Sequence, residues 1–298
     1  MASISTQVLG TLAAASFLIL QANADAPVAS VAPAAGGDAA PSAPDYRVTQ
    51  TVSLGAPDRW DYLTFDSSAS RVYVAHGDRV TVFDTVSGHL FVLNGDTATI
   101  TVIDPKLNQA VATILGGGKL EFGVSGNNGK LYVNGAGNNE LIRVDTHSNK
   151  VDAHWPMSGC KSPHGLAIDL LTHRLFSSCV NNVLKVVNAD SGEVVASVPI
   201  GAGTDFAGFD PKRRLVFSSN GKDGTLSIIQ EKDAQTFVPL GDIKTAPMAR
   251  TMTINPDTGR LFLVAADADP NPKVTGLDQH HMAIAAGSVK LIILDPVP

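Results

Sequence analysis

A short motif recurs along the chain, and its spacing limits the possible folds more than any other feature of the sequence. Each copy begins with a basic residue or histidine and continues through apolar or small residues toward a turn that usually contains Gly or Asn. The six copies are Arg71–Gly77, His89–Gly95, Lys130–Gly135, Arg174–Cys179, Arg214–Gly221 and Arg260–Ala265. Their first residues are separated by 18, 41, 44, 40 and 46 residues. Four of these five intervals match one four-stranded blade of a β-propeller, which takes about 40–50 residues.

The residues within one interval have the pattern of four short strands. Gly165–Asp169, Arg174–Cys179, Val183–Asn188 and Glu193–Pro199 contain Val, Ile, Leu or Phe and are bounded by Asn, Asp, Gly or Ser. No 3.6-residue apolar period appears in the repeat region. The sequence therefore predicts an all-β fold, a β-propeller of four-stranded blades.

Acidic residues stand where several predicted strands end. Asp84, Asp104 and Asp145 each follow an apolar run, and Asp210 precedes a proline at the start of a turn. Because an aspartate side chain accepts hydrogen bonds from the backbone of a following turn, we interpret these acids as turn formers and not as catalytic groups.

The two ends of the repeat region predict how the fold closes. The last unit ends with one strand, Ser288–Leu294, whereas Tyr46–Leu54 is strand-like and has no unit of its own. We predict that Tyr46–Leu54 forms the outer strand of the final blade and thereby pairs otherwise exposed edges.

One interval is too short for a blade. The 18 residues between Arg71 and His89 have room for two strands and not four. We expect that the outer strand of one blade and the inner strand of the next are missing between Gly88 and Leu90, through a natural compact blade or a deletion.

Residues 1–24 have the pattern of an export signal. Val8–Leu20 is a mainly apolar run of 13 residues, and residues 22–24 offer a small-x-small cleavage pattern. Such a run is short for a membrane span, which needs about 20 residues, although a retained anchor is the alternative. Residues 25–45, built mostly from Ala, Pro, Gly, Ser and Val, predict a disordered linker. We expect a periplasmic or secreted β-propeller over residues 46–298, with no transmembrane span after signal cleavage.

The motif copies resemble a known repeat. Residues 72–77, 91–96 and 131–135, each followed by a strand ending in Val-Asp, Ile-Asp or a similar sequence, look like the YVTN-type β-propeller repeat of the exported, YncE-like group. The resemblance covers residues 46–298 and implies a propeller of typically seven blades. Six motif copies are present here, so one blade is absent in addition to the shortened join. Wider relatives include lactonase-like, quinoprotein-like and streptogramin-lyase-like propellers.

Ionisable residues recur nine or ten positions before each of five motif copies. These positions precede the predicted innermost strands and should face the mouth of the central channel. They are occupied by Asp61, Glu121, His164, Asp205 and Arg250. His76 lies in a loop predicted on the same face. We expect these side chains to be exposed at the mouth and to be candidates for binding a ligand or metal.

Three interpretations of these candidate site residues remain open. The carboxylates and His164 can hold a divalent metal, with oxygen ligands favouring Ca²⁺ and the imidazole a transition metal, so the cofactor is left unknown. His164 can instead act as a general base while Arg250 binds an anionic group. In the third reading the channel contains only water and Arg250 pairs with Asp61 or Asp205.

The composition narrows the choice of partners. The chain has 28 acidic and 22 basic residues, a net charge of -6, and no basic stripe interleaved with aromatic residues. Nucleic-acid binding is therefore not supported, although some YncE-like relatives are associated with it. The leading hypothesis is an exported propeller that binds a small molecule or protein at the channel face without turnover. The alternatives are a metal-dependent lactonase- or lyase-like enzyme and a structural scaffold of the cell envelope.

The two cysteines predict one disulfide. Cys160 and Cys179 are the only cysteines in the sequence, and export would place them in an oxidising compartment. If Gly165–Asp169 pairs with Arg174–Cys179 as a hairpin, Cys179 lies opposite His164 and Cys160 can fold back over the strand end. Two buried thiols are the alternative.

Overall fold

The computed structural model describes residues 46–53, 63–66, 71–74, 79–83, 87–104, 106–271 and 283–297. The chain divides into two units, Met1–Ala40 and Pro41–Pro298, and every described residue belongs to the second. The expected signal peptide and linker therefore lie outside the described residues, and so do Asp61 and His76.

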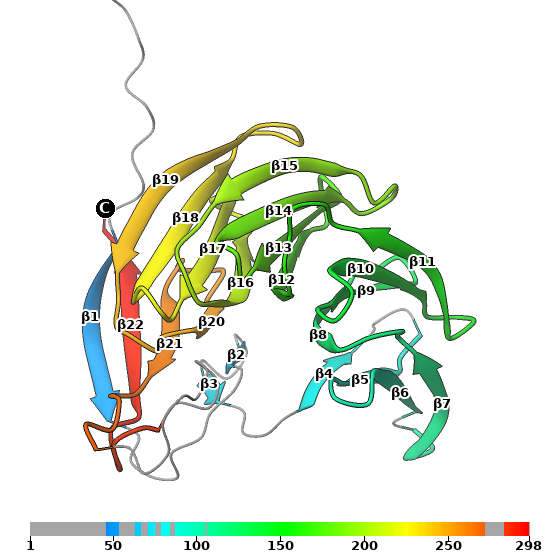
Figure 1. Ribbon diagram of the computed structural model, residues 1–298, viewed down its shortest axis with the longest axis horizontal. Coiled ribbons are helices and arrows are strands. Elements are labelled where there is room, and N and C mark those ends of the chain that lie inside the picture. Colours follow the sequence, from blue (N-terminus) through cyan, green and yellow to red (C-terminus); the bar gives the residue numbers. More distant parts are fainter. Residues whose placement is uncertain are drawn as a thin grey trace, which may run out of the picture. The chain divides into compact units, whose positions relative to one another are not determined.

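The described strands form six antiparallel sheets (Figure 1). The first sheet has two described strands, β2 (Leu63–Asp66) and β3 (Arg71–Val74). The other five have four strands each. From the innermost strand outward they are β4 (Arg79–Phe83), β5 (Leu90–Asn94), β6 (Thr99–Asp104), β7 (Gln109–Leu115); β8 (Leu120–Ser125), β9 (Lys130–Gly135), β10 (Glu140–Asp145), β11 (Lys150–Pro156); β12 (Pro163–Asp169), β13 (Arg174–Cys179), β14 (Val183–Asn188), β15 (Val194–Pro199); β16 (Thr204–Asp210), β17 (Leu215–Asn220), β18 (Thr225–Glu231), β19 (Phe237–Lys244); and β20 (Thr251–Ile254), β21 (Leu261–Ala265), β22 (Lys290–Pro296), β1 (Tyr46–Ser53).

Consecutive sheets pack on one another through apolar clusters. One cluster combines residues of the β12–β15 sheet, such as Phe176, with residues of the β16–β19 sheet, such as Val216. Similar clusters join the β4–β7 sheet to the β8–β11 sheet and the latter to the β12–β15 sheet. The innermost strands contact one another in the order β4, β8, β12, β16, β20 and β2. The fold is a β-propeller, as the repeat predicted.

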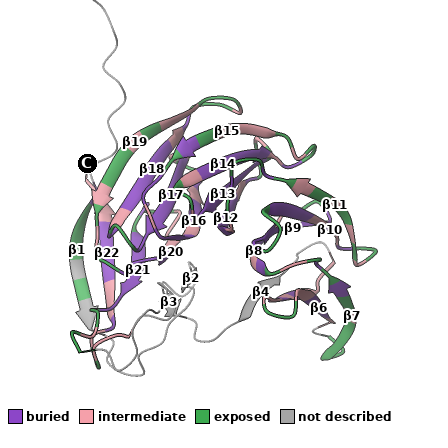
Figure 2. Cartoon of the chain, viewed as in Figure 1, coloured by how far each residue is buried: buried purple, intermediate pink, exposed green. Residues whose placement is uncertain are grey.

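The position of a strand in its blade explains its residues. The second strands β13 and β17 are buried along their whole length, whereas the outer strands β11 and β19 contain only exposed and partly buried residues (Figure 2). A strand covered by neighbouring sheets on both faces can be apolar or small throughout, whereas a strand with one solvated face alternates. This difference explains why the second strand of each blade carries the recognisable motif.

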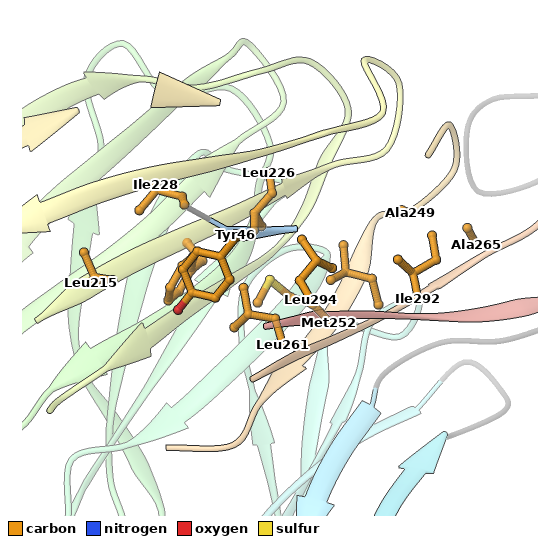
Figure 3. Packing of buried hydrophobic residues seen from close by; sticks show 12 residues of the cluster. Tyr46, Leu215, Leu226, Ile228, Ala249, Met252, Leu261, Ala265, Ile292 and Leu294 are labelled. Atoms are coloured by element: carbon orange, nitrogen blue, oxygen red, sulfur yellow. The ribbon is translucent and has the colours of Figure 1, made fainter. Parts of the chain in front are cut away.

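The N-terminal strand closes the last blade, which confirms the prediction for Tyr46–Leu54. β1 pairs antiparallel with β22, with Tyr46 opposite Pro296 and Ser53 opposite Lys290. Tyr46 is 3% exposed, and its hydroxyl donates a 3.1 Å hydrogen bond to the carbonyl oxygen of Gly259. Figure 3 shows its ring among leucine, isoleucine and methionine side chains from the last two blades.

The short interval is accommodated differently from our expectation. We predicted the loss of an outer and an inner strand between Gly88 and Leu90. The structure instead pairs β4 with β5, so Arg79–Phe83 supplies the innermost strand of the second sheet. Among the described strands, the sheet with fewer than four is therefore β2–β3. One four-stranded blade buries both of its faces better than two incomplete blades, which gives a physical reason for this pairing.

The aspartates at strand ends form turns as predicted. The Asp145 carboxylate accepts hydrogen bonds from the backbone amides of His147 and Ser148 at 3.2 and 2.8 Å. The Asp210 carboxylate accepts hydrogen bonds from the backbone amides of the two residues after Pro211, and Asp104 accepts one from the amide of Lys106. Asp84 lies outside the described residues.

Two buried carboxyl groups meet between the β12–β15 and β16–β19 blades. The Thr172 hydroxyl lies 2.8 Å from an oxygen of Asp169 and 2.8 Å from an oxygen of Glu231. Burial raises the pKa of Glu231 to about 7, and the charge and hydrogen bond of Asp169 add to this, against the hydrogen bond of Thr172 and the charge of Arg214. The Thr172 hydroxyl has one hydrogen, so it can donate to only one of the two carboxyl groups at a time. The other carboxyl group can keep its hydrogen bond to Thr172 if it is protonated and donates to the hydroxyl oxygen.

This pair predicts a pH dependence of stability. Because the pKa of Glu231 is higher in the folded than in the unfolded chain, its contribution is complete below about pH 4.5 and is lost as the pH rises through about 7. Glu231→Gln should therefore increase the free energy of unfolding at pH 8 by about 3 kcal/mol and flatten its decrease between pH 4.5 and 7. Urea denaturation across this range measures the effect, with the exposed Glu193→Gln as the control. An unchanged pH profile in Glu231→Gln would contradict the prediction.

Candidate functional site

Four of the predicted site residues lie at equivalent places in four consecutive blades. Glu121, His164 and Asp205 lie near the starts of the innermost strands β8, β12 and β16. Arg250 directly precedes the innermost strand β20. Counting nine or ten residues back from a motif copy therefore identified the start of the innermost strand in each of these four blades.

A β-bulge occurs at this position in three of the four blades. The strand register shifts between Leu120 and Gly123 in β8, between Pro163 and Leu166 in β12, and between Thr204 and Phe206 in β16. Glu121, His164 and Asp205 fall inside these shifts. A bulge breaks the alternation of side chains and turns one toward a new direction, so each bulge redirects an ionisable side chain.

The bulge in β12 corrects one detail of the predicted register. Cys179 lies opposite Pro163 and not opposite His164. The turn region follows the prediction, with Asp169 opposite Arg174. The extra residue in β12 accounts for the shift of one position.

Three of the four residues form one hydrogen-bonded row across blades. His164 Nδ1 lies 3.0 Å from Asp205 Oδ1, and Arg250 Nε donates to Asp205 Oδ2 at 3.0 Å. The exposed fractions of His164, Asp205 and Arg250 are 6%, 4% and 9%. Our expectation that these side chains are exposed was therefore wrong, because neighbouring innermost strands approach closely and cover them. The pairing of Arg250 with Asp205, expected for a structural role, is present.

Charged groups next to this row act on His164. Lys119 Nζ and Glu121 Oε1 form a 2.9 Å ion pair, in which the lysine side chain is 56% exposed and the glutamate 17%. Burial lowers the pKa of His164, but the hydrogen bond and charge of Asp205, with the charge of Glu121, outweigh burial and raise it overall. Lys119 opposes this rise. The site therefore favours the protonated imidazole more than water does.

Polar residues of the second strands hold the backbone of the site. Asn134, which is fully buried, donates from its amide to the carbonyl oxygens of His164 and Gly165 at 2.8 and 3.0 Å. Ser177 donates to the Asn134 side-chain oxygen at 2.8 Å. The Ser219 hydroxyl donates a hydrogen bond to the backbone carbonyl oxygen of Arg250. Asn and Ser residues of the repeat motif thus bind backbone carbonyl groups at the bulge in β12 and at the residue before β20.

Sequence reasoning missed Asn134, Lys119 and Ser162. Asn134 was visible only as a turn residue of the motif, and its bonds to the next blade depend on the packing of two sheets. Lys119 lies two positions before Glu121 and carried no separate signal. Ser162 Oγ lies 3.3 Å from His164 Nε2, although the sequence has no Gly-x-Ser-x-Gly pattern around it.

The predicted disulfide is present beside the site. Cys160 and Cys179 are bonded, with their Cα atoms 5.5 Å apart. The bond joins the loop before β12 to the end of β13, and both cysteines are buried in the core shared with the β8–β11 blade. The loop that leads to His164 is therefore covalently fixed to its own hairpin.

The described side chains that could ligate a metal do not gather at one place. No group of three or more His, Cys, Asp or Glu side chains with metal-binding geometry occurs within the described part of the chain. His154 instead pairs with Glu140 at 3.2 Å, and His173 pairs with Asp190 at 3.0 Å. Asp61 and His76, which the metal-binding hypothesis also includes, lie outside the described residues.

No helix among the described residues is long and apolar enough to cross a membrane.

One of three comparisons with known proteins bears on the fold of this chain. No protein-family model matches the chain, and no curated protein matches it significantly in sequence. Among solved structures, the chain is similar to hydrazine synthase of Kuenenia stuttgartiensis, with a TM-score of 0.52 and 14% identity. The match covers 66% of this chain and 58% of the hydrazine synthase chain. At this identity the similarity concerns the fold alone.

Proposed function

We propose that this protein is an exported, YVTN-type propeller that binds a small polar molecule or a protein group at the face formed by the starts of its innermost strands. The observation that carries the proposal is the row His164–Asp205–Arg250, extended by Glu121 and Lys119. Ionisable side chains are costly to bury, and four blades place them at the same end. Propellers of many functions place their sites where such strand ends converge.

The charges indicate what such a ligand carries. The site contains cationic groups at Lys119 and Arg250 and anionic groups at Glu121 and Asp205. A ligand with both hydrogen-bond donors and a carboxylate or similar anionic group would match this alternation. The disulfide and the signal-like residues 1–24 support a periplasmic or secreted location, because disulfides persist in oxidising compartments.

Thermal unfolding in the presence of a compound panel tests the proposal. The panel contains dicarboxylates, amino acids, sugars, CaCl₂ and ZnCl₂, the last two with and without EDTA. A ligand present at 100 times its Kd stabilises the folded state by about 2.7 kcal/mol, which raises the midpoint by roughly 5–10 °C. We expect a small-molecule shift in the wild type that Asp205→Asn and Arg250→Gln lose. Each variant is compared with its own ligand-free midpoint.

The control is Lys212→Gln, which removes the exposed ion pair with Asp257 and leaves the site intact. It should keep the full shift. Equal shifts in all variants, or none in any, would contradict binding at this site. A shift produced only by a metal ion and reversed by EDTA would favour the metal-dependent alternative instead.

A further inference from the structure

Ser162, His164 and Asp205 form a continuous hydrogen-bonded series. Ser162 Oγ lies 3.3 Å from His164 Nε2, and His164 Nδ1 lies 3.0 Å from Asp205 Oδ1. The imidazole and carboxylate are buried, whereas Ser162 is partly exposed. Ser162 is therefore closer to solvent than the imidazole and the carboxylate behind it.

The contact with Asp205 fixes the role of one imidazole nitrogen. An aspartate carboxylate accepts hydrogen bonds, so His164 donates from Nδ1 to Asp205. In the neutral ring Nε2 then accepts a hydrogen bond from the Ser162 hydroxyl, whereas in the protonated ring Nε2 donates to it, so Ser162 is activated only in molecules whose His164 is neutral. This is the order in which a nucleophile, a base and an orienting acid are connected in acyl-transfer enzymes.

The blade that carries Ser162 differs from its neighbours in the side chain at one backbone turn. The residue two positions before each site residue has a positive φ in three blades: +42° at Ser162, +77° at Gly203 and +66° at Met248. The backbone turn is therefore a property of the repeat. Among these three positions, the chain combines a hydroxyl with a neighbouring histidine only at Ser162.

The loop that carries Ser162 is held at several points. The Ser162 amide donates to the Asn139 side chain at 2.7 Å, and the Lys161 amide donates to the Asn181 side chain at 2.8 Å. The Cys160–Cys179 disulfide anchors the same loop. Asp205 is in turn held by Arg250 at 3.0 Å. Fixed geometry of this kind is what catalysis by a side-chain nucleophile requires.

We propose that Ser162 is a nucleophile activated by His164 and positioned by Asp205, and that the protein transfers acyl groups from small carboxylic esters. Ser162 Oγ bonds to the acyl carbon while its proton passes to His164 Nε2. The ester C–O bond breaks, and the departing alkoxide takes the proton from His164. Water then attacks the acyl-serine while His164 accepts its proton. The bond between the acyl carbon and Ser162 Oγ breaks, Ser162 takes that proton from His164, and the carboxylic acid is released. The inference goes beyond the proposed function, which requires binding alone.

The test uses a fluorophosphonate, which reacts with activated serines without requiring the natural ligand. Ser162 Oγ would bond to phosphorus, fluoride would leave, and the serine proton would pass to His164. We expect one adduct per chain by intact mass, located on Ser162 by peptide mapping, and no adduct in Ser162→Ala. Ser158→Ala, which changes an exposed serine in the same loop, should label like the wild type.

A histidine variant separates a catalytic from a structural role. His164→Ala should slow labelling at least 100-fold, because a general base contributes about 10²–10⁴. Added imidazole should restore part of the rate, which it would not do for a misfolded chain. An unlabelled wild type, labelling spread over exposed serines including Ser158, or an unchanged rate in His164→Ala would overturn the proposal. If Ser162 fails to label while compounds of the panel still shift the wild type, the nucleophile is refuted and the binding function stands.

Discussion

Replacing Tyr46 with alanine is expected to lower the free energy of unfolding by about 3–5 kcal/mol, the usual cost of removing a buried aromatic side chain. The ring lies in the core cluster of the last two blades, 5.8 Å from the ring of Phe217 in an edge-to-face arrangement. It is the first described residue of the strand that completes the last blade. The substitution therefore removes core packing and weakens closure at once. Urea denaturation followed by circular dichroism measures the loss.

Two further variants of the same strand resolve this cost into parts. Tyr46→Phe keeps the ring and removes the hydrogen bond to the Gly259 carbonyl, which should cost about 1 kcal/mol. Val48→Ala changes a side chain that is 44% exposed, so its effect should stay below about 1 kcal/mol. A loss of less than about 1 kcal/mol in Tyr46→Ala would mean that β1 does not pack in the last blade.

Gly165→Ala is expected to destabilise the protein by about 3 kcal/mol or more, through steric overlap alone. A Cβ atom at this position would lie 2.1 Å from the amide nitrogen of Ala207 and 2.3 Å from the carbonyl carbon of Phe206. Both atoms belong to the backbone of β16, so β12 and β16 would have to separate. The separation would also break the contact between His164 and Asp205, and NMR of the imidazole nitrogens would report it beside the urea measurement.

The control for Gly165 is a glycine with space around it. Gly287 has φ of +73°, and a Cβ atom added there would have no heavy atom within 4 Å apart from those of its chain neighbours. Gly287→Ala should cost about 1 kcal/mol from backbone conformation and leave the imidazole signals unchanged. Equal losses of unfolding free energy in the two variants would show that the close approach of β12 and β16 is not the reason why position 165 requires glycine.

Local sequence patterns were sufficient for much of this fold. Strand lengths, aspartate turns and the repeat interval depend on residues close in sequence, and they predicted the blades. The pairing of Tyr46–Ser53 with the last blade followed from counting strands, and the Cys160–Cys179 bond from there being two cysteines and one hairpin. Each of these inferences needed no knowledge of how two blades pack.

The properties of the site depend on that packing and could not be obtained in the same way. The burial of His164 and Asp205 results from the close approach of β12 to β16, which is marked in the sequence only by one glycine among 27. The bulges add residues to a strand without changing its composition, so they leave no signal in an apolar pattern. The contact of Ser162 with His164 depends on both features.

The closing strand has a consequence for the order of folding. β1 is near the start of the chain, yet its partner β22 begins at Lys290, so the pairing of Tyr46 with Pro296 joins residues from opposite ends of the propeller sequence. Contacts so distant in sequence form late, after the intervening blades have shortened the effective loop. When the chain is synthesised from its N-terminus, Tyr46–Ser53 must remain unpaired until every other blade exists. Arg47, Thr49, Gln50 and Thr51 give the unpaired strand polar groups that discourage pairing with other chains.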